Sequence, residues 1–317
     1  MGSGPHLARR TLLHLIFGWL YATRKLRAAP RAPEEEQPRR LLRGFRRVGR
    51  FERRYRVDAT VLLLGIPIFS RQGVGSGYAA AEMGRGESEN AIALQFAAGS
   101  WPDRCHGLNR YGVLQEVHLE RRGAPEEIAF AGLITPSKED DLDGAKKALR
   151  APDGEMDVTV ARGSSSEGRM RFRVGSATVP AHSDWTALAE MIDRVSASPV
   201  IAPREAPLEG STTFMQAMRC AALNADSSFR CAFMHNGKQF VLETRRKPNA
   251  PDELSGTIKT SLGAKAAEFR TTYARGDESG LPSRIDYHAK SYLRLTFTDE
   301  GDSTPVPIPT LFPEEVL

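Results

Sequence analysis

From residue 51 onwards, hydrophobic and polar residues alternate along short stretches of the chain. In YRVDATVLLLG, the side chains of Tyr55, Val57, Ala59, Val61 and Leu63 would share one face of a strand, because successive side chains of a strand point to opposite faces. The same period of two, bounded by turn residues, predicts further strands. These strands are Ala91–Ala98, Val113–Arg121, Glu127–Ile134, Met156–Ala161, Arg169–Val179, Leu254–Ser261 and Ala267–Ala274.

The clearest hairpin lies in FRCAFMHNGKQFVLETRR. Apolar residues alternate on both sides of Asn236-Gly237, the residue pair that two-residue type I′ turns prefer. Nearer the C-terminus, the alternation runs through Ser283–Thr298. We expect one long final strand there, with a bulge near Lys290.

Hydrophobic residues at helical spacing are fewer. Trp185–Ser196 carries apolar residues at i, i+3, i+4 and i+7 after Ser183-Asp184, which predicts a capped helix. Thr212–Leu223 is a second expected helix, and residues 137–150 could form a short third one. The predicted fold class is therefore mainly β (α+β), a curved antiparallel sheet or half-barrel with two or three helices.

Shifts in composition divide the chain into five segments. We expect a basic arm over 1–50, β-rich units over 51–198 and 209–300, a linker over 199–208 and an extended tail over 301–317. Prolines mark the linker and the tail, and proline cannot donate a backbone hydrogen bond to a helix or a central strand.

The positive charge of the chain is concentrated at its N-terminus. Residues 1–56 contain 15 Lys or Arg and four Glu, which leaves 29 of the 44 basic and 35 of the 39 acidic residues for the rest. The body is therefore mildly acidic. Because nucleic-acid binding requires a basic face for the phosphates, we expect no nucleic-acid partner.

The beginning of the arm has the organisation of an export signal. Arg9-Arg10 precedes the apolar stretch Leu12–Ala22, which is shorter than the roughly 20 residues that span a bilayer and is typical of a signal h-region. The basic cluster from Arg24 to Arg27 is unusual for the general export route. We expect a periplasmic or cell-envelope location, and a cytoplasmic amphipathic arm is the alternative.

A second basic segment, RRLLRGFRRVGRFERRYR, covers residues 39–56. Its apolar residues recur at helical spacing and leave the arginines on the other face. The pattern predicts either a helix lying on an anionic membrane surface or a solvated lead-in that packs on the body. The arginines that would contact the membrane are Arg39, Arg40, Arg43, Arg46, Arg47 and Arg50.

Three cysteines are too few for a disulfide scaffold or a four-cysteine zinc site. Cys220 and Cys231 flank a turn signal at Asn224-Ala225-Asp226. In an exported protein these two could form a disulfide, and the alternative is two buried thiols. Cys105 is left over in either case.

Two segments imitate ligand-binding loops. GVGSGYAAAE (73–82) has the glycines of a phosphate loop, but it neither follows a strand directly nor precedes the acidic residue of a dinucleotide site. EDDLDGAKKALR (139–150) has acids at calcium-loop positions, but Arg150 stands where a bidentate Glu is required. We therefore expect no cofactor and no metal, and we place the glycines on a strand that another segment approaches closely.

Three stretches, YRVDATVLLLGIPIFS, FMHNGKQFVLETR and GLPSRIDYHAKSYLRLTF, resemble an uncharacterised bacterial family of predicted exported proteins, a domain of unknown function. The resemblance covers roughly residues 51–298 and its motifs are structural. It implies an envelope-associated β-rich fold, similar to the half-barrels of lipoprotein carriers. No catalytic residue carries over from it.

These observations predict a non-catalytic envelope protein that binds a hydrophobic ligand (a lipid or lipoprotein-like molecule) or a partner polypeptide. Ala91–Ala98 and Ser283–Phe297 would line its cavity. One alternative is a hydrolase or lyase whose site combines dispersed residues such as His106, His235 and Asp286, although no catalytic sequence motif is present. Another is a scaffold that acts on membrane surfaces through the basic arm.

Overall fold

The computed structural model describes residues 42, 44–105, 110–134, 155–166, 169–180, 208–303 and 306–312. The strands of the first half are β1 (Arg46–Leu63), β2 (Ile66–Arg85), β3 (Glu89–Ser100), β4 (Tyr111–Arg121), β5 (Ala124–Ile134), β6 (Glu155–Ser166), β7 (Arg169–Pro180) and β8 (Leu208–Gly210). The second half contains β9 (Thr212–Thr213), helix α5 (Phe214–Leu223), β10 (Ser228–His235), β11 (Lys238–Lys247), β12 (Ala250–Thr260), β13 (Lys265–Thr272), β14 (Arg284–Lys290), β15 (Leu293–Asp299) and the short 3₁₀ turn Gly301–Ser303.

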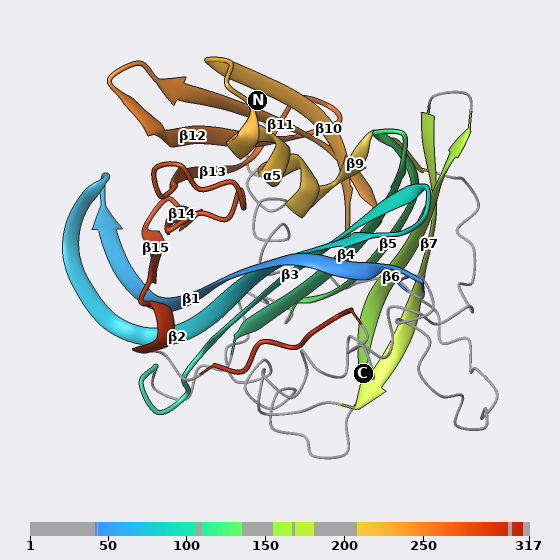
Figure 1. Cartoon of the computed structure of the whole chain (residues 1–317). Coiled ribbons are helices and arrows are strands. Elements are labelled where there is room, and N and C mark those ends of the chain that lie inside the picture. Colours follow the sequence, from blue (N-terminus) through green and yellow to red (C-terminus); the bar gives the residue numbers. More distant parts are fainter. Residues whose placement is uncertain are drawn as a thin grey trace, which may run out of the picture.

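All of these strands belong to a single 15-stranded sheet in the order β8-β7-β6-β5-β4-β3-β2-β1-β15-β14-β13-β12-β11-β10-β9. Neighbouring strands are antiparallel except β9 and β10, which run parallel. The sheet curls into a nearly closed, barrel-like shape around α5 (Figure 1). The protein is therefore mainly β, with one α-helix among its described residues.

The first and last long strands meet in the middle of the sheet. β1 pairs with β2 on one side and with β15 on the other, with Tyr55 opposite Asp299 and Val61 opposite Leu293. Strands from both expected β-rich units are thus joined by hydrogen bonds in one sheet. Of the expected linker 199–208, the structure describes Leu208, which begins β8.

A short segment brings the two edges of the sheet together. β8 pairs with β7 at one edge, β9 pairs with β10 at the other, and Ser211 alone separates β8 from β9. The Ser211 hydroxyl also donates a hydrogen bond to the carbonyl of Ala232 on β10. The chain itself therefore connects the first edge to the last.

Most strand predictions are confirmed, including the hairpin at Asn236-Gly237, where both residues have positive φ (46° and 69°), as a type I′ turn requires. The single strand over Ser283–Thr298 is wrong. β14 and β15 form a hairpin instead, with Tyr287 opposite Leu295. Both strands direct apolar side chains into the barrel interior. The alternation of apolar and polar residues therefore continues across the turn, and the sequence pattern does not indicate where the turn lies.

The amphipathic helix expected over residues 39–56 is also wrong for residues 46–56, because these belong to β1. Phe51 pairs with Ala81 of β2 along this strand. The glycine at position 49 weakens a helix, and pairing with β2 supplies the backbone hydrogen bonds that the segment would otherwise make as a helix.

The helix expected over Thr212–Leu223 is confirmed as α5. The two other expected helices, Trp185–Ser196 and 137–150, lie outside the described residues, and so does the segment that resembles a calcium loop. Of the two or three predicted helices, the structure therefore tests one, and that one is present.

Away from their exposed hairpin ends, strands β2 to β5 are buried on both faces. One face points into the barrel, where residues such as Leu94 and Leu114 pack toward α5. The other face is covered by the C-terminal tail: Val306 packs near Val113, and Phe312 packs against Ala91 and its neighbours. Figure 1 shows this tail running along the outside of the sheet beneath β1 and β3.

The glycines of GVGSGYAAAE lie on β2, as expected, and have a packing role. A Cβ atom at Gly75 would lie 2.3 Å from the carbonyl oxygen of Gly99, and one at Gly77 would lie 2.7 Å from that of Ala97. Because real Cβ atoms do not approach so closely, these positions require glycine for β2 and β3 to pair.

Candidate functional site

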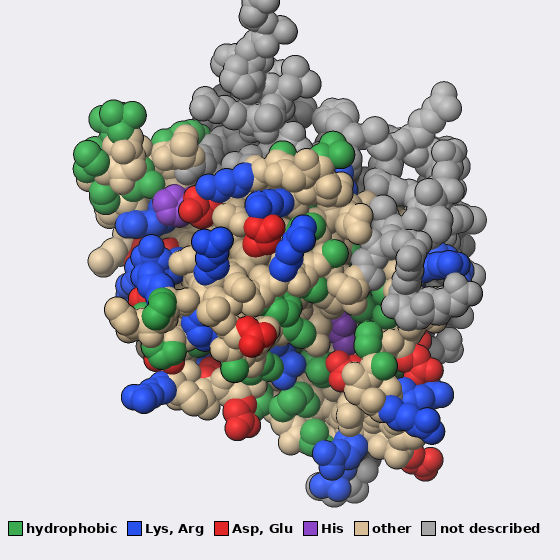
Figure 2. Space-filling view, turned by 90° about the horizontal axis from the view of Figure 1, so that it is seen from above, with side chains coloured by type: hydrophobic (Ala, Val, Ile, Leu, Met, Phe, Trp, Pro, Cys, Tyr) green, Lys and Arg blue, Asp and Glu red, His purple; other side chains and the backbone are tan. Residues whose placement is uncertain are grey.

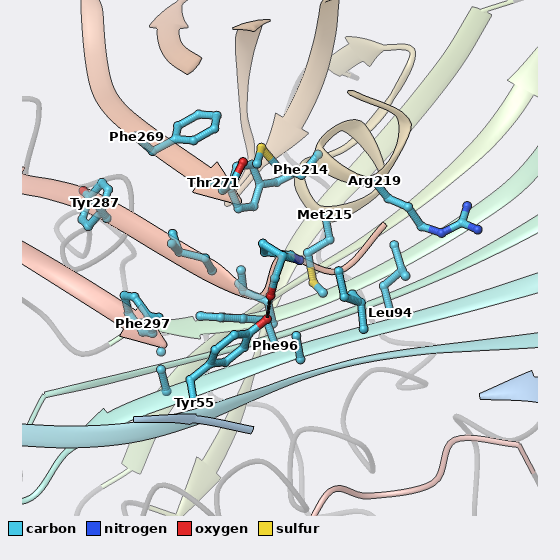
Figure 3. A pocket seen from close by; sticks show the side chains of 18 of the residues that line it. Tyr55, Leu94, Phe96, Phe214, Met215, Arg219, Phe269, Thr271, Tyr287 and Phe297 are labelled. Carbon is cyan, nitrogen blue, oxygen red and sulfur yellow. Dashed lines mark hydrogen bonds between the residues drawn. The ribbon is translucent and has the colours of Figure 1, made fainter. Parts of the chain in front are cut away.

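A cavity of about 140 Å³ lies inside the barrel between α5 and the surrounding strands. Its wall combines side chains from both halves of the chain, including Tyr55, Phe96 and Phe297 from β1, β3 and β15, and Phe214 and Met215 from α5 (Figure 3). The wall is almost entirely apolar. The cavity is therefore suited to a hydrophobic guest.

Aromatic rings fix one side of the cavity. The rings of Tyr55 and Phe297 meet edge to face with centroids 6.3 Å apart, and those of Phe96 and Phe297 are 6.0 Å apart. The Tyr55 hydroxyl donates a 2.6 Å hydrogen bond to the carbonyl of Pro282. Burial raises the pKa of Tyr55 well above its ordinary value, so this hydroxyl stays protonated and committed to Pro282.

Small residues leave the space that the aromatic rings enclose. Ala79, Ala98 and Gly112 line the cavity from β2, β3 and β4. Larger side chains at these positions would project into the cavity, because alternate residues of each strand face the barrel interior.

The predicted lining segments do contribute to this wall. Leu94, Phe96 and Ala98 line it from Ala91–Ala98, and Ile285, Tyr287 and Phe297 line it from Ser283–Phe297. The intervening alanines of β3, such as Ala93 and Ala97, face the opposite side and pack in the outer layer. The prediction is thus confirmed for alternate residues.

A buried carboxylate holds α5 in place beside the cavity. Glu116 on β4 accepts hydrogen bonds from the backbone N–H groups of Met215 (2.9 Å) and Gln216 (3.1 Å) and from the Thr213 hydroxyl. The ring of His118 completes the cluster, with Nε2 at 3.2 Å from Glu116 and 3.1 Å from Thr213 Oγ1. Glu116 therefore caps the helix N-terminus from another element, where a negative group is favoured.

The grouping of Thr213, His118 and Glu116 has the residue types of a nucleophile, a base and an orienting acid. Their side chains are at most 2% exposed, however, and both oxygens of Glu116 already accept hydrogen bonds from the helix amides. We therefore assign the cluster a structural role.

Sequence reasoning missed this cluster. The available signal was Glu116 and His118 two residues apart in a strand that also contains Val113, Leu114, Val117 and Leu119. Such spacing places both side chains on one buried face, but their partner Thr213 lies 97 residues from Glu116 along the chain.

The dispersed catalytic residues do not converge where the structure describes them. His106 lies outside the described residues. His235 lines the cavity, with its ring centroid 5.5 Å from that of Phe214. Asp286 alternates with Ile285 on β14 and so faces the opposite side, where it accepts hydrogen bonds from other side chains.

The arginines predicted to contact a membrane fall into two groups. Arg46 and Arg47 are exposed at the beginning of β1, whereas Arg50 is half-buried. Contact of the exposed pair with a membrane stays a prediction. The others, Arg39, Arg40 and Arg43, lie outside the described residues.

Arg50 connects β1 to the C-terminal tail. Its guanidinium forms an ion pair with Glu82 and donates to Thr310 Oγ1 (2.9 Å) and the carbonyl of Ile308 (3.0 Å). Glu82, only 1% exposed, also accepts hydrogen bonds from the backbone N–H groups of Leu311 and Phe312. The structure thus gives Arg50 a role in docking the tail.

Cys220 on α5 and Cys231 on β10 are both free thiols in the structure and half-buried. Burial raises the pKa of each. A disulfide between them stays a prediction for the oxidised protein.

In the described part of the chain, no group of three or more His, Cys, Asp or Glu residues is arranged to hold a metal ion. The single described α-helix is also too short to cross a bilayer. Of the predicted site features, the apolar cavity is therefore the one that the described residues assemble.

Comparison with known protein families and with curated proteins finds no match. Among solved structures, the chain is similar to a β-barrel-like protein of the domain of unknown function DUF1849 from Brucella abortus, with a TM-score of 0.41 and 8% sequence identity. The aligned region covers 78% of this chain and 96% of that chain. Export and a relation to lipoprotein carriers stay predictions.

Proposed function

We propose that this protein is a non-catalytic binder of a hydrophobic ligand, a lipid or lipoprotein-like molecule, which the barrel holds beside α5. The observation that carries the proposal is the apolar cavity of about 140 Å³. An engineered apolar cavity of about 150 Å³ stays dry and admits benzene. A ring or a short stretch of acyl chain is the kind of group that fits.

Three polar side chains around the cavity favour an apolar guest because the protein itself already binds their polar atoms. The Tyr55 hydroxyl donates to Pro282, and the Thr271 hydroxyl donates to the Tyr273 oxygen at 3.2 Å. Arg219 donates through Nε to the carbonyl of Ser279, and Figure 3 shows its guanidinium extending away from the aromatic side chains. A polar ligand would lose its hydration there with little compensation.

Two measurements test ligand binding. Extraction of the purified protein with organic solvent, followed by mass spectrometry, should release an apolar compound. Titration of the extracted protein with the neutral fluorescent probe N-phenyl-1-naphthylamine should show saturable binding.

A cavity-filling variant ties that binding to this site. Ala79→Leu with Ala98→Leu adds side-chain carbons from two walls, and we expect at least tenfold weaker probe binding. Ala274→Leu adds the same group at an exposed position and should leave the affinity unchanged. Absence of both a bound compound and saturable probe binding would refute the proposal, as would equal affinity in the filled variant.

We also propose an envelope location, which rests on the pattern of the N-terminal arm. Fractionation of the native host and N-terminal sequencing of the mature chain test it. Recovery of the intact N-terminus in the cytoplasm would contradict it.

A further inference from the structure

One end of the barrel exposes an unusual number of hydrophobic side chains. Among the described residues, nine large hydrophobic side chains are strongly exposed, and seven of them lie on or beside turns at this end. Two, Leu64 and Leu262, are each 96% exposed. We call these seven residues the apolar end: Leu63, Leu64, Ile66, Ile68, Phe69, Leu262 and Tyr292.

The antiparallel topology brings these residues together. The turn after β1, the turn between β14 and β15, and the turn between β12 and β13 fall at the same end of adjacent strands. The first two are in contact, since the Leu62 N–H donates a 2.8 Å hydrogen bond to the carbonyl of Tyr292. Figure 2 shows hydrophobic side chains gathered on a projection at the left edge, where the β1–β2 and β12–β13 hairpins end in Figure 1.

A bulge allows the β1–β2 hairpin to project. The pairing register shifts between Val57 and Ala59, and opposite this point Gly73 adopts a φ of 60°. The backbone N–H of Gly73 donates to the Asp58 carboxylate at 2.8 Å, which fixes the bend. Beyond it, every residue from 63 to 70 is exposed.

The segments that form the apolar end contain basic residues and no acidic ones. Residues 59–72 and 287–298 contain no Asp or Glu, and they include Arg71, Lys290 and Arg294. The β12–β13 turn, residues 257–267, also lacks acids, and its two lysines, Lys259 and Lys265, form ion pairs with Glu243 and Glu268 just outside it. Monomeric soluble proteins rarely expose large apolar patches without a binding role, and basic residues beside such a patch suit an anionic surface.

We propose that the apolar end inserts into the headgroup region of an anionic lipid bilayer. The hydrophobic groups lie on or beside three separate turns, and a fluid bilayer can receive several separate projections without a matching groove. Tyr292 and Phe69 add the aromatic side chains that favour the membrane interface. This membrane contact goes beyond the proposed ligand binding and does not depend on it.

The apolar end differs from the basic arm as a membrane contact. Arg46 and Arg47 begin β1, whereas Leu63 ends it, and the strand has 18 residues. At about 3.3 Å per residue, roughly 55 Å of strand separates the two. Substitutions can therefore test each contact separately.

Flotation of the full-length protein with large unilamellar vesicles tests the proposal. Vesicles of phosphatidylcholine with phosphatidylglycerol should carry the protein upward more strongly than phosphatidylcholine alone. Leu64→Asp with Leu262→Asp should weaken partitioning at least tenfold, because two apolar side chains lose their burial. Val48→Asp is a control for the added acidic group, since Val48 is 54% exposed on β1 at the opposite end from the β1–β2 turn.

A second measurement reports insertion directly. Phe69→Trp should add tryptophan emission that shifts to the blue with vesicles and that brominated lipids quench. Unchanged flotation of the double Asp variant would overturn the proposal. Loss of vesicle binding in the Arg46→Gln, Arg47→Gln double variant would also overturn it, because binding would then depend on the basic residues at the other end of β1. If the protein self-associated through Leu64 and did not bind vesicles, the apolar end would be a protein interface, and the membrane proposal would also be overturned. In each case the cavity titration reports ligand binding independently.

Discussion

Replacing Glu116 by Ala removes the carboxylate that holds the first turn of α5 inside the barrel. Glu116 is fully buried and accepts hydrogen bonds from two backbone N–H groups, those of Met215 and Gln216, and from the hydroxyl of Thr213. Each buried donor left without a partner costs about 1–3 kcal/mol. Water entering the space of the lost side chain offsets part of this. We therefore expect a loss of about 4 kcal/mol in the free energy of unfolding.

Glu116→Gln removes the negative charge of the side chain but keeps its size and shape. The amide retains one acceptor oxygen, but its NH₂ group would face a helix N–H, and the favourable charge at the helix N-terminus is lost. We expect this variant to lose about 2 kcal/mol, roughly half the effect of Ala.

Urea unfolding followed by circular dichroism and tryptophan fluorescence measures both variants. Glu87→Ala is the control, because Glu87 is an exposed glutamate in the β2–β3 turn and its loss should change stability by less than about 0.5 kcal/mol. If Glu116→Ala unfolded within about 1 kcal/mol of the wild type, the carboxylate would not support α5 as we infer.

Two further predictions concern the tail and the pH dependence of stability. Gly84→Ala would place a Cβ atom 2.2 Å from the Phe312 ring, and we expect a loss of about 1–3 kcal/mol in thermal unfolding; an unchanged transition would contradict this packing. Burial raises the pKa of Asp277, but hydrogen bonds from Ser279 and Arg53 outweigh it, and the net pKa lies below the ordinary 3.8. Because the pKa of Asp277 is lower in the folded protein, the ionised carboxylate stabilises the fold at pH values above about 4, and this stabilisation is lost as the pH falls below about 4. Asp277→Asn should therefore reduce the acid sensitivity of unfolding, and an unchanged pH profile would exclude this contribution.

Local patterns in the sequence predict the strands but not their partners. Asn236-Gly237 predicts a hairpin because both residues tolerate positive φ. The alternation of apolar and polar residues predicts the neighbouring strands. The pairing of β1 with β15 joins Tyr55 to Asp299, and no local pattern records a contact across so much of the chain. The continuous sheet was therefore beyond sequence reasoning.

The same limit applies to the candidate site. The lining of the cavity was predictable in part, because alternation along β3 places Leu94, Phe96 and Ala98 on one face. The capping of α5 by Glu116 was not, because a buried carboxylate in a strand is recognised only when its distant donors are known. Where local and long-range signals disagreed, as over residues 46–56, strand pairing overrode helical spacing.

The position of the tail bears on how the chain acquires its native state during synthesis. Leu311 and Phe312 cover Ala91 and Ala93 on the outside of β3, and 220 residues separate Ala91 from Leu311. At about 5–20 residues per second, translation takes roughly 10–45 s to cover that distance. For that interval, an apolar surface of the nascent polypeptide lacks its native cover and is open to chaperones or to aggregation.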